Sequence, residues 1–84
     1  MKIVAIDPTP NPNSLKFSLD TAVGKAGTYS AGKPDGCPEA IQPVLAVPGV
    51  QSIFATAKFF TITRDPNVAW DAIVSGVRAH IPGA

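Results

Sequence analysis

Residues 9–19 read Thr-Pro-Asn-Pro-Asn-Ser-Leu-Lys-Phe-Ser-Leu, a proline-rich stretch that leads directly into an alternating one. From residue 14 to residue 19 polar Ser, Lys and Ser alternate with apolar Leu, Phe and Leu. Alternation with a period of two predicts a β-strand that has one buried face and one face in water. The prolines fix φ and remove backbone donors, so residues 9–13 are predicted to form a rigid loop before this strand.

Further segments rich in β-branched or aromatic side chains extend the sheet. Residues 3–6, 50–54 and 58–64 each predict a strand, and residues 28–31 predict a short additional one. Three residues separate the segments at 50–54 and 58–64, and a connection of that length is typical of a hairpin.

Alternation along the last predicted strand gives it two distinct faces. Phe60 is predicted to point into the core, and Thr61 and Thr63 are predicted to point the other way. Phe59 has the opposite parity to Phe60 and is the aromatic residue expected at the open face. Phe54 is expected on the core face.

Two segments predict helices. Residues 66–81 carry an apolar stripe of helical spacing, and the helix is expected to begin at residue 66 or 67 and to stop at Pro82. The stripe consists of Trp70, Ile73, Val74, Val77 and Ile81. Residues 37–47 also show roughly helical spacing, but Pro43 would remove an internal hydrogen bond, so a short or kinked helix is expected there.

This order of elements predicts an α+β fold. The simplest arrangement is a two-layer sandwich, in which a mostly antiparallel sheet of four to five strands carries both helices on one face. The other face stays partly solvated, which an antiparallel sheet tolerates. A length of 84 residues is that of one domain, and a single domain over residues 1–84 is expected.

The composition excludes several classes of protein. The formal net charge is +1 and there is no basic run, which argues against a nucleic-acid binder held by phosphate contacts. One Cys excludes an intramolecular disulfide and favours the cytoplasm as the compartment. No apolar stretch reaches the roughly 18–20 residues of a membrane span, and Asp7 interrupts the apolar start, so neither a membrane anchor nor an export signal is expected.

The sequence contains no pattern typical of an enzyme. Its acidic residues are scattered over turns and helix starts, where carboxylates cap the backbone rather than work as a general acid–base pair. A Gly-rich phosphate loop and a Gly-x-Ser-x-Gly motif are both missing from the sequence. We therefore expect a protein that is not an enzyme and holds no cofactor.

Residues 9–17 resemble the opening signature of the N-terminal domain of Nfu-type (NifU-type) iron–sulfur cluster scaffold proteins. Residues 47–54 are similar to the family's segment that enters its hairpin, and residues 59–63 to the return strand of that hairpin. Trp70 fits the final helix, and the similarity is weakest over residues 20–43.

The resemblance implies an accessory role. In Nfu proteins a separate C-terminal domain binds the cluster through a Cys-x-x-Cys pair, and this sequence contains no such pair. What the resemblance implies is therefore a stand-alone copy of the N-terminal domain, a module that contacts iron–sulfur assembly proteins or apo-client proteins.

Four residues are candidates for contact with a partner: Asn11, Asn13, Lys16 and Phe59. A structural interpretation of the loop stands beside this one, because prolines reduce the entropy of the unfolded chain and Asn side chains form turns with the backbone. Loops serve both as scaffold and as binding site, so both interpretations remain open here.

Cys37 and His80 are the candidate metal ligands. A thiol at a helix start gains thiolate character, although a free Cys more often behaves as a small buried hydrophobe. His80 suits the C-terminal end of the last helix as an ordinary surface residue. Two ligands fall short of the four that zinc takes, so these side chains would hold a metal only as a bridge between two chains.

Three hypotheses follow. The first is a non-catalytic interaction module of iron–sulfur cluster assembly, which would offer the Pro-rich loop and the solvated sheet face to its partner. The second is a binding module recruited to some other assembly. The third is a dimer bridged by a metal at Cys37 and His80.

Overall fold

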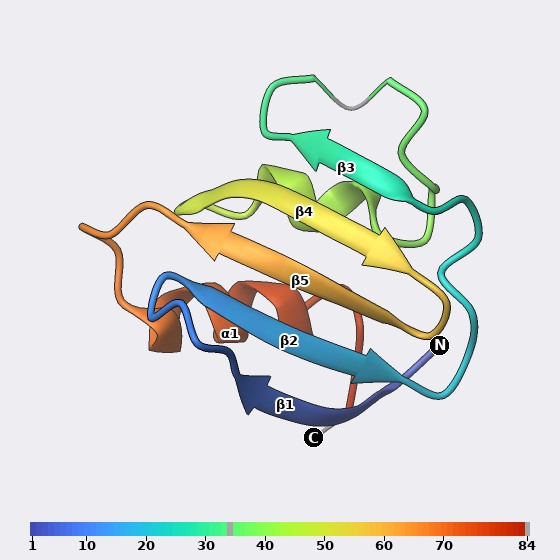
Figure 1. Ribbon diagram of the computed structural model, residues 1–84, viewed down its shortest axis with the longest axis horizontal. Helices are drawn as coiled ribbons and strands as arrows, with labels where there is room; N and C mark the ends of the chain where they lie inside the picture. Colours follow the sequence, from blue (N-terminus) through green and yellow to red (C-terminus); the bar gives the residue numbers. More distant parts are fainter. Residues whose placement is uncertain (34, 84) are drawn as a thin grey trace.

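The computed structural model describes residues 1–33 and 35–83. It contains five strands, one α-helix and one 3₁₀ helix (Figure 1). The strands are β1 (Ile3–Pro8), β2 (Ser14–Leu19), β3 (Gly27–Ser30), β4 (Val50–Thr56) and β5 (Phe59–Arg64). The 3₁₀ helix is η1 (Gln42–Ala46) and the α-helix is α1 (Trp70–Arg78).

The five strands form one antiparallel sheet in the order β1-β2-β5-β4-β3. The predicted alternating strand at 14–19 is confirmed, as is the hairpin of β4 and β5. The short segment near residue 28 pairs with β4 at the sheet edge, so the predicted additional strand is also confirmed. Ala57 takes a left-handed φ of 47° in the two-residue turn between β4 and β5, which an Ala seldom adopts.

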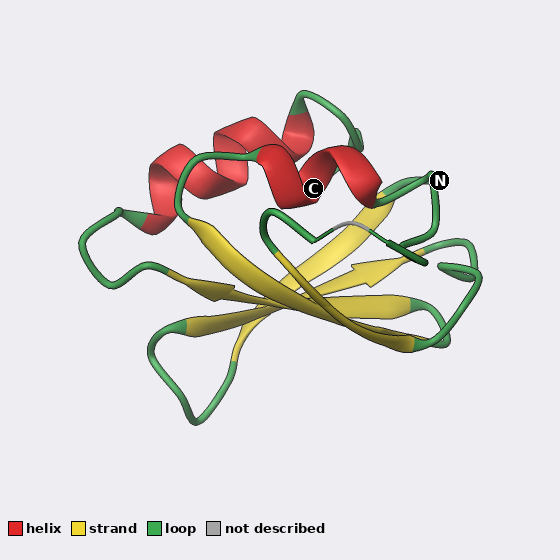
Figure 2. Ribbon diagram, turned by 90° about the horizontal axis from the view of Figure 1, so that it is seen from above, coloured by secondary structure: helices red, strands yellow, loops and turns green. Residues whose placement is uncertain are grey.

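Both helical segments cover the same face of the sheet (Figure 2). The prediction of two helices was wrong in one respect, because only one of them is an α-helix and the other is a 3₁₀ helix of five residues. Pro43 lies at the start of η1 and has no N–H to donate, and Val44 donates to the carbonyl of Ile41, three residues back. The layers and the α+β class match the prediction.

α1 begins later than the sequence predicts. The carboxylate of Asp65 accepts a hydrogen bond from the backbone N–H of Asn67 at 2.9 Å, and the carbonyl of Asp65 accepts one from the N–H of Val68 at 3.0 Å. These bonds close a turn over residues 65–68 in place of the first helical turn. The helix therefore starts at Trp70.

The core lies between the sheet and the helical layer. The rings of Phe17 in β2 and Phe60 in β5 stack with their centroids 5.1 Å apart. Ile73 and Val77 of α1 are fully buried against this layer, whereas Trp70 is half-buried. The expectation for Phe54 was wrong: 47% of its surface is exposed, because its neighbours Ile53 and Ala55 point into the core and alternation turns Phe54 outward.

Candidate functional site

The Pro-rich loop at residues 9–13 is braced by its own side chains. The side-chain oxygen of Asn11 accepts a hydrogen bond from the N–H of Asn13 at 2.9 Å, which closes an Asx turn. The hydroxyl of Thr9 donates toward the carbonyls of Asn11 and Ser14 at 2.9 and 3.1 Å. The structural interpretation of Asn11 therefore has direct support, while its side chain remains exposed at the surface.

A second set of contacts fastens the same loop to the start of α1. The indole Nε1 of Trp70 donates to the carbonyl of Pro12 at 3.2 Å. The guanidinium of Arg64 lies 5.1 Å from the centre of the Trp70 ring and donates to the carbonyl of Val68 at 3.3 Å. Arg64 Nε also reaches the side-chain oxygen of Asn13 at 3.4 Å. Asn13 is therefore held at this corner between the end of β5 and α1.

The sheet face opposite the helices carries Lys16 near its centre. The strand register aligns Lys16 of β2 with Thr61 of β5, and Thr61 with Phe54 of β4. The ammonium Nζ of Lys16 lies 4.5 Å from the centre of the Phe59 ring, a cation–π distance. Phe54 and Phe59 belong to neighbouring strands and are diagonal neighbours on this face. We call Lys16, Phe54 and Phe59 the open-face patch.

The structure thus brings Lys16 and Phe59 together and leaves the two asparagines elsewhere. Asn11 and Asn13 precede the first residue of β2, whereas Phe59 is aligned with Ser18 near the far end of that strand. Phe54 is the residue that the sequence interpretation missed. Its position between the apolar Ile53 and Ala55 carried the signal, because in a strand only one parity faces the core.

Hydroxyl side chains surround the open-face patch. Thr61 and Thr63 are half-buried on this face, as the sequence predicted, and the Ser14 and Thr63 hydroxyl oxygens lie 3.3 Å apart. The remaining open-face hydroxyls, placed by the strand register, are those of Ser18, Thr28, Ser30, Ser52 and Thr56. The two phenylalanines therefore lie among many hydroxyl side chains on this face.

Cys37 is buried within the core cluster, with 8% of its surface exposed. Burial raises the pKa of its thiol, which disfavours the thiolate needed by a nucleophile or a metal ligand. The α-helix start expected beside Cys37 is absent, since this stretch forms turns before η1, and the charge stabilisation expected from it is missing too.

His80 is exposed and lies just beyond α1, which ends at Arg78. Within residues 1–33 and 35–83, no group of three or more His, Cys, Asp or Glu side chains is placed to hold a metal ion. A metal bridge between two chains would need the buried Cys37 to reach the surface first.

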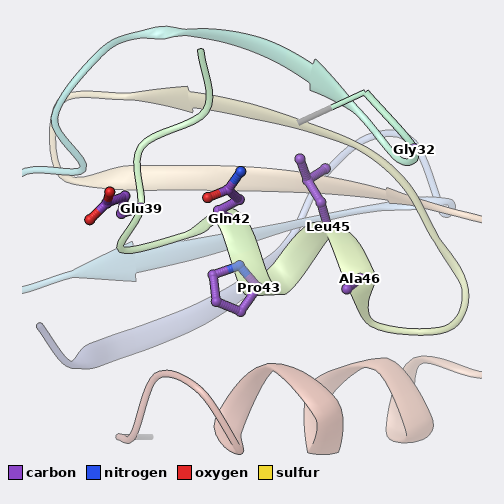
Figure 3. Close-up of a pocket in the computed structure, with 6 residues that line it drawn as sticks. All are labelled: Gly32, Glu39, Gln42, Pro43, Leu45 and Ala46. Atoms are coloured by element: carbon purple, nitrogen blue, oxygen red, sulfur yellow. The ribbon is translucent and has the colours of Figure 1, made fainter. Parts of the chain in front are cut away.

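A pocket of about 610 Å³ opens beside η1 on the helical side of the sheet (Figure 3). It is lined by Gly32, Glu39, Gln42, Pro43, Leu45 and Ala46. Gln42 and Leu45 point to one side of η1, and Pro43 and Ala46 to the other. Glu39 is the one ionisable group in this lining, so the pocket lacks the paired acid and base that catalysis by proton transfer requires.

The sequence matches a known family over nearly its whole length. The family model described as scaffold protein Nfu/NifU N terminal matches residues 3–83. The chain belongs to the Nfu/NifU N-terminal family. The resemblance seen in residues 9–17 is thereby confirmed.

Among the described residues, no helix has the length and apolar character that a membrane span requires.

Curated relatives carry this domain within longer sequences. Conserved virulence factor C of Staphylococcus saprophyticus is 37% identical over 83 residues, which cover 96% of this chain and 22% of that protein. Uncharacterized protein YpgR of Bacillus subtilis is 34% identical over 80 residues, which cover 93% of this chain and 21% of that protein. The chain thus spans about a fifth of the length of these relatives.

Solved structures share the Nfu/NifU N-terminal fold. The crystal structure of protein SAV1430 from Staphylococcus aureus superposes with a TM-score of 0.81 at 33% identity, covering 94% of this chain and 96% of that one. The solution structure of a NifU-like protein from Saccharomyces cerevisiae gives a TM-score of 0.67 at 25% identity, covering 92% of this chain and 74% of that one.

Proposed function

We propose that this Nfu/NifU N-terminal domain is a non-catalytic interaction module of iron–sulfur cluster assembly. It is proposed to act as one domain over residues 1–84 and to dock, through the open-face patch, onto an assembly protein or an apo-client protein. The observation that carries this proposal is the exposed Phe54 beside the Lys16–Phe59 pair on the sheet face opposite η1 and α1.

The burial of Phe54 within the domain is incomplete. Phe54 leaves 47% of its surface in water, and covering such a side chain is favourable by about 25 cal/mol per Å². Phe is also among the aromatic residues that are enriched at protein–protein interfaces relative to the rest of the surface. Lys16 stacks on Phe59 instead of pairing with Asp7, its neighbour in register on β1, and its ammonium remains available for a carboxylate of a partner.

The Pro-rich loop has a supporting part in this proposal. Asn11 and Asn13 brace the loop beside the first residue of β2, and the exposed Asn11 extends the contact surface beyond the patch. The rigidity of the loop lowers the entropy lost on binding, which is how preorganised surfaces gain affinity.

The family relation and the chemistry of the chain support a role without catalysis or a bound cluster. The scaffold family gives the connection to cluster assembly, and the buried Cys37 with its raised thiol pKa offers no open ligand site. The single Cys is compatible with the reducing cytoplasm, which we propose as the compartment.

Affinity capture with matched variants tests the proposal. The double variant F54S/F59S removes both aromatic rings from the open face, and Q42A removes an exposed side chain from the opposite, helical layer. Cluster-assembly proteins should be enriched by the wild type and by Q42A and lost with F54S/F59S. Equal enrichment by all three proteins would contradict docking through the patch.

A second candidate function is recruitment to an assembly unrelated to iron–sulfur clusters. It is favoured by the relatives named conserved virulence factor C, in which about four fifths of the sequence lies outside this domain. Capture of unrelated proteins through the same patch, with no cluster-assembly protein among them, would favour this candidate.

A further inference from the structure

Residues 81–83 lie along the outer side of β1, the strand at one edge of the sheet (Figure 1). The backbone N–H of Ile3 donates to the carbonyl of Pro82 at 2.8 Å, and Ile3 forms a parallel bridge with Gly83. Ile81 is buried in the core cluster, so the segment is anchored immediately before these contacts. We call residues 81–83 the edge guard.

Gly83 brings the edge guard into close contact with the backbone of β1. Its φ is +133°, and a Cβ at this position would overlap the carbonyl oxygen and the amide nitrogen of Ile3. Glycine is the residue that suits both a positive φ and such a close approach of two backbones. A side chain at position 83 would therefore displace the edge guard from β1.

The strand register shows which backbone groups of β1 face outward. The N–H of Leu19 donates to the carbonyl of Lys58 on the β5 side of β2, so the neighbouring Ser18 directs its backbone groups toward β1. Ala5 is aligned with Ser18 and directs its own groups toward β2, so the next residue, Ile6, directs its N–H and carbonyl away from the sheet.

The outer edge of β1 thus offers two residues for pairing, Ile3 and Ile6. The register shift between Ile3 and Ala5 explains why residues three positions apart face the same side. The edge guard occupies Ile3, and in the described part of the chain the outward groups of Ile6 form no backbone hydrogen bond. Pro8 has no N–H and limits the edge at the other end of the strand. An unpaired strand edge is a template for another strand, and the edge guard closes part of this template.

We propose that the outer edge of β1 is a self-association surface for a second copy of this chain, which the edge guard keeps closed. When two β1 strands pair in antiparallel fashion, Ile3 of each copy lies opposite Ile6 of the other, and the outward backbone groups of both residues are satisfied. The edge guard takes the same N–H of Ile3, so the two contacts exclude each other. This surface is separate from the open-face patch, and either proposal can fail without the other.

The exposed side chains along this edge favour a second copy as the occupant. In the antiparallel register Lys2 of one copy lies opposite Asp7 of the other, and two-fold symmetry produces this contact of opposite charges twice. Both side chains are exposed, and alternation places both on the open side of the sheet. Val4, which is 57% exposed, lies at the centre of the register, where burial by the second copy is favourable.

Sedimentation velocity with G83A tests the proposal. This variant adds the overlapping Cβ and frees Ile3, so it is expected to strengthen self-association about tenfold or more, within the micromolar to millimolar range typical of small contacts. The wild type should remain monomeric over that range. G32A is the matched control, since Gly32 also has a positive φ, +81°, with nothing within 4 Å, and it should remain monomeric too. A folded G83A as monomeric as the wild type would overturn the proposal.

Hydrogen exchange at the Ile6 amide is a second readout, and in the wild type it does not depend on how well G83A folds. The Ile6 amide of the wild type should exchange fast at every concentration, because its N–H faces outward and is unpaired. In G83A its protection should rise with concentration. Protection of Ile6 in the wild type that rises with concentration would overturn closure by the edge guard.

Exchanged charges test the register of the two strands. D7K and K2E, each added to G83A, place like charges opposite each other in a homodimer, and each is expected to weaken self-association about fivefold or more. Mixing the two proteins restores opposite charges at both contacts, so a heterodimer should form about as tightly as the G83A dimer. A mixture that associates no better than either protein alone would overturn pairing through β1.

Discussion

The indole nitrogen of Trp70 donates a hydrogen bond to the carbonyl of Pro12 at 3.2 Å, joining residues 58 positions apart. This bond connects the Pro-rich loop, which carries the sequence signature of the family, to the first residue of α1. Arg64 stacks on the same ring and reaches Asn13, so strand, loop and helix meet at one corner. The signature loop is therefore a structural feature of the domain as well as a candidate contact.

Replacing Trp70 tests the strength of this corner. W70F retains a ring beneath Arg64 but removes the hydrogen bond to Pro12, and it is expected to lower the free energy of unfolding by about 0.5–1.5 kcal/mol. W70A also removes the ring and should destabilise further. Urea unfolding of the three proteins measures the difference, and W70F as stable as the wild type would show that the bond adds nothing.

Asn11 provides a test that separates its two roles. N11A removes the acceptor of the Asx turn and is expected to lower the free energy of unfolding by about 0.5–1.5 kcal/mol. N11D keeps an oxygen acceptor at the same place and should retain most of that stability. If N11A is destabilised and still captures the partner fully, Asn11 is a bracing residue and not a contact.

Substitutions at Gly49 and Gly32 together distinguish the cost of backbone strain from the cost of close packing. Its φ is +98°, and a Cβ there would lie 2.6 Å from Cγ1 of Val68. G49A should therefore destabilise the domain through both effects, by about 2–4 kcal/mol. G32A is the control, since Gly32 has a φ of +81° with nothing within 4 Å, and it should show the strain alone, about 1 kcal/mol. Thermal unfolding would refute the packing contribution if both variants lost equal stability.

The environment of Cys37 predicts slow chemistry at its thiol. Burial raises the pKa of the thiol, so the folded protein favours the protonated form of Cys37. The stabilisation that comes from this protonated form is fully present below the pKa of the unfolded thiol and declines as the pH rises above it. Reaction with a thiol reagent at pH 8 should be slow in the native protein and immediate in guanidinium chloride. Prompt reaction of the native protein would reinstate Cys37 as a candidate redox or metal-binding residue.

The lowered pKa of the Asp20 carboxyl predicts that the domain loses stability in acid. Its pKa is lowered by the hydrogen bond from the Lys2 N–H, with a smaller contribution from the Thr21 hydroxyl, so its stabilising effect is present above the unfolded pKa. That effect is lost as the pH falls through the lower, folded pKa. D20N keeps an oxygen acceptor without the charge, and its stability should fall less steeply below pH 4 than that of the wild type. Parallel pH profiles of the two proteins would contradict this role.

Local patterns in the sequence were sufficient to locate the strands, but they did not give the strand order β1-β2-β5-β4-β3. The alternation in residues 14–19 and the short connection before β5 predicted these strands and their faces, because strand periodicity depends only on neighbouring residues. The same rule, applied to Ile53 and Ala55, would have placed Phe54 on the open face. That aromatic residue was instead assigned to the core on its hydrophobicity alone.

Other features depend on contacts that no local pattern contains. The start of α1 at Trp70 follows from side-chain hydrogen bonding by Asp65, which competes with the first helical turn. The bond from Trp70 to Pro12 and the contact of Lys16 with Phe59 each join distant segments, and both depend on strand order. Lys16 and Phe59 could thus be predicted as separate candidates, whereas Phe54 was missed, and the assembly of the three into a patch required the fold.

Docking of a partner on the open face can be mapped directly on the labelled domain. Once an assembly protein has been captured, it is added unlabelled to the ¹⁵N-labelled chain, and the amide signals are compared residue by residue. If the partner docks there, shifts and broadening should centre on residues 16, 54, 59 and 61. Changes confined to η1 and α1 on the opposite layer would contradict it.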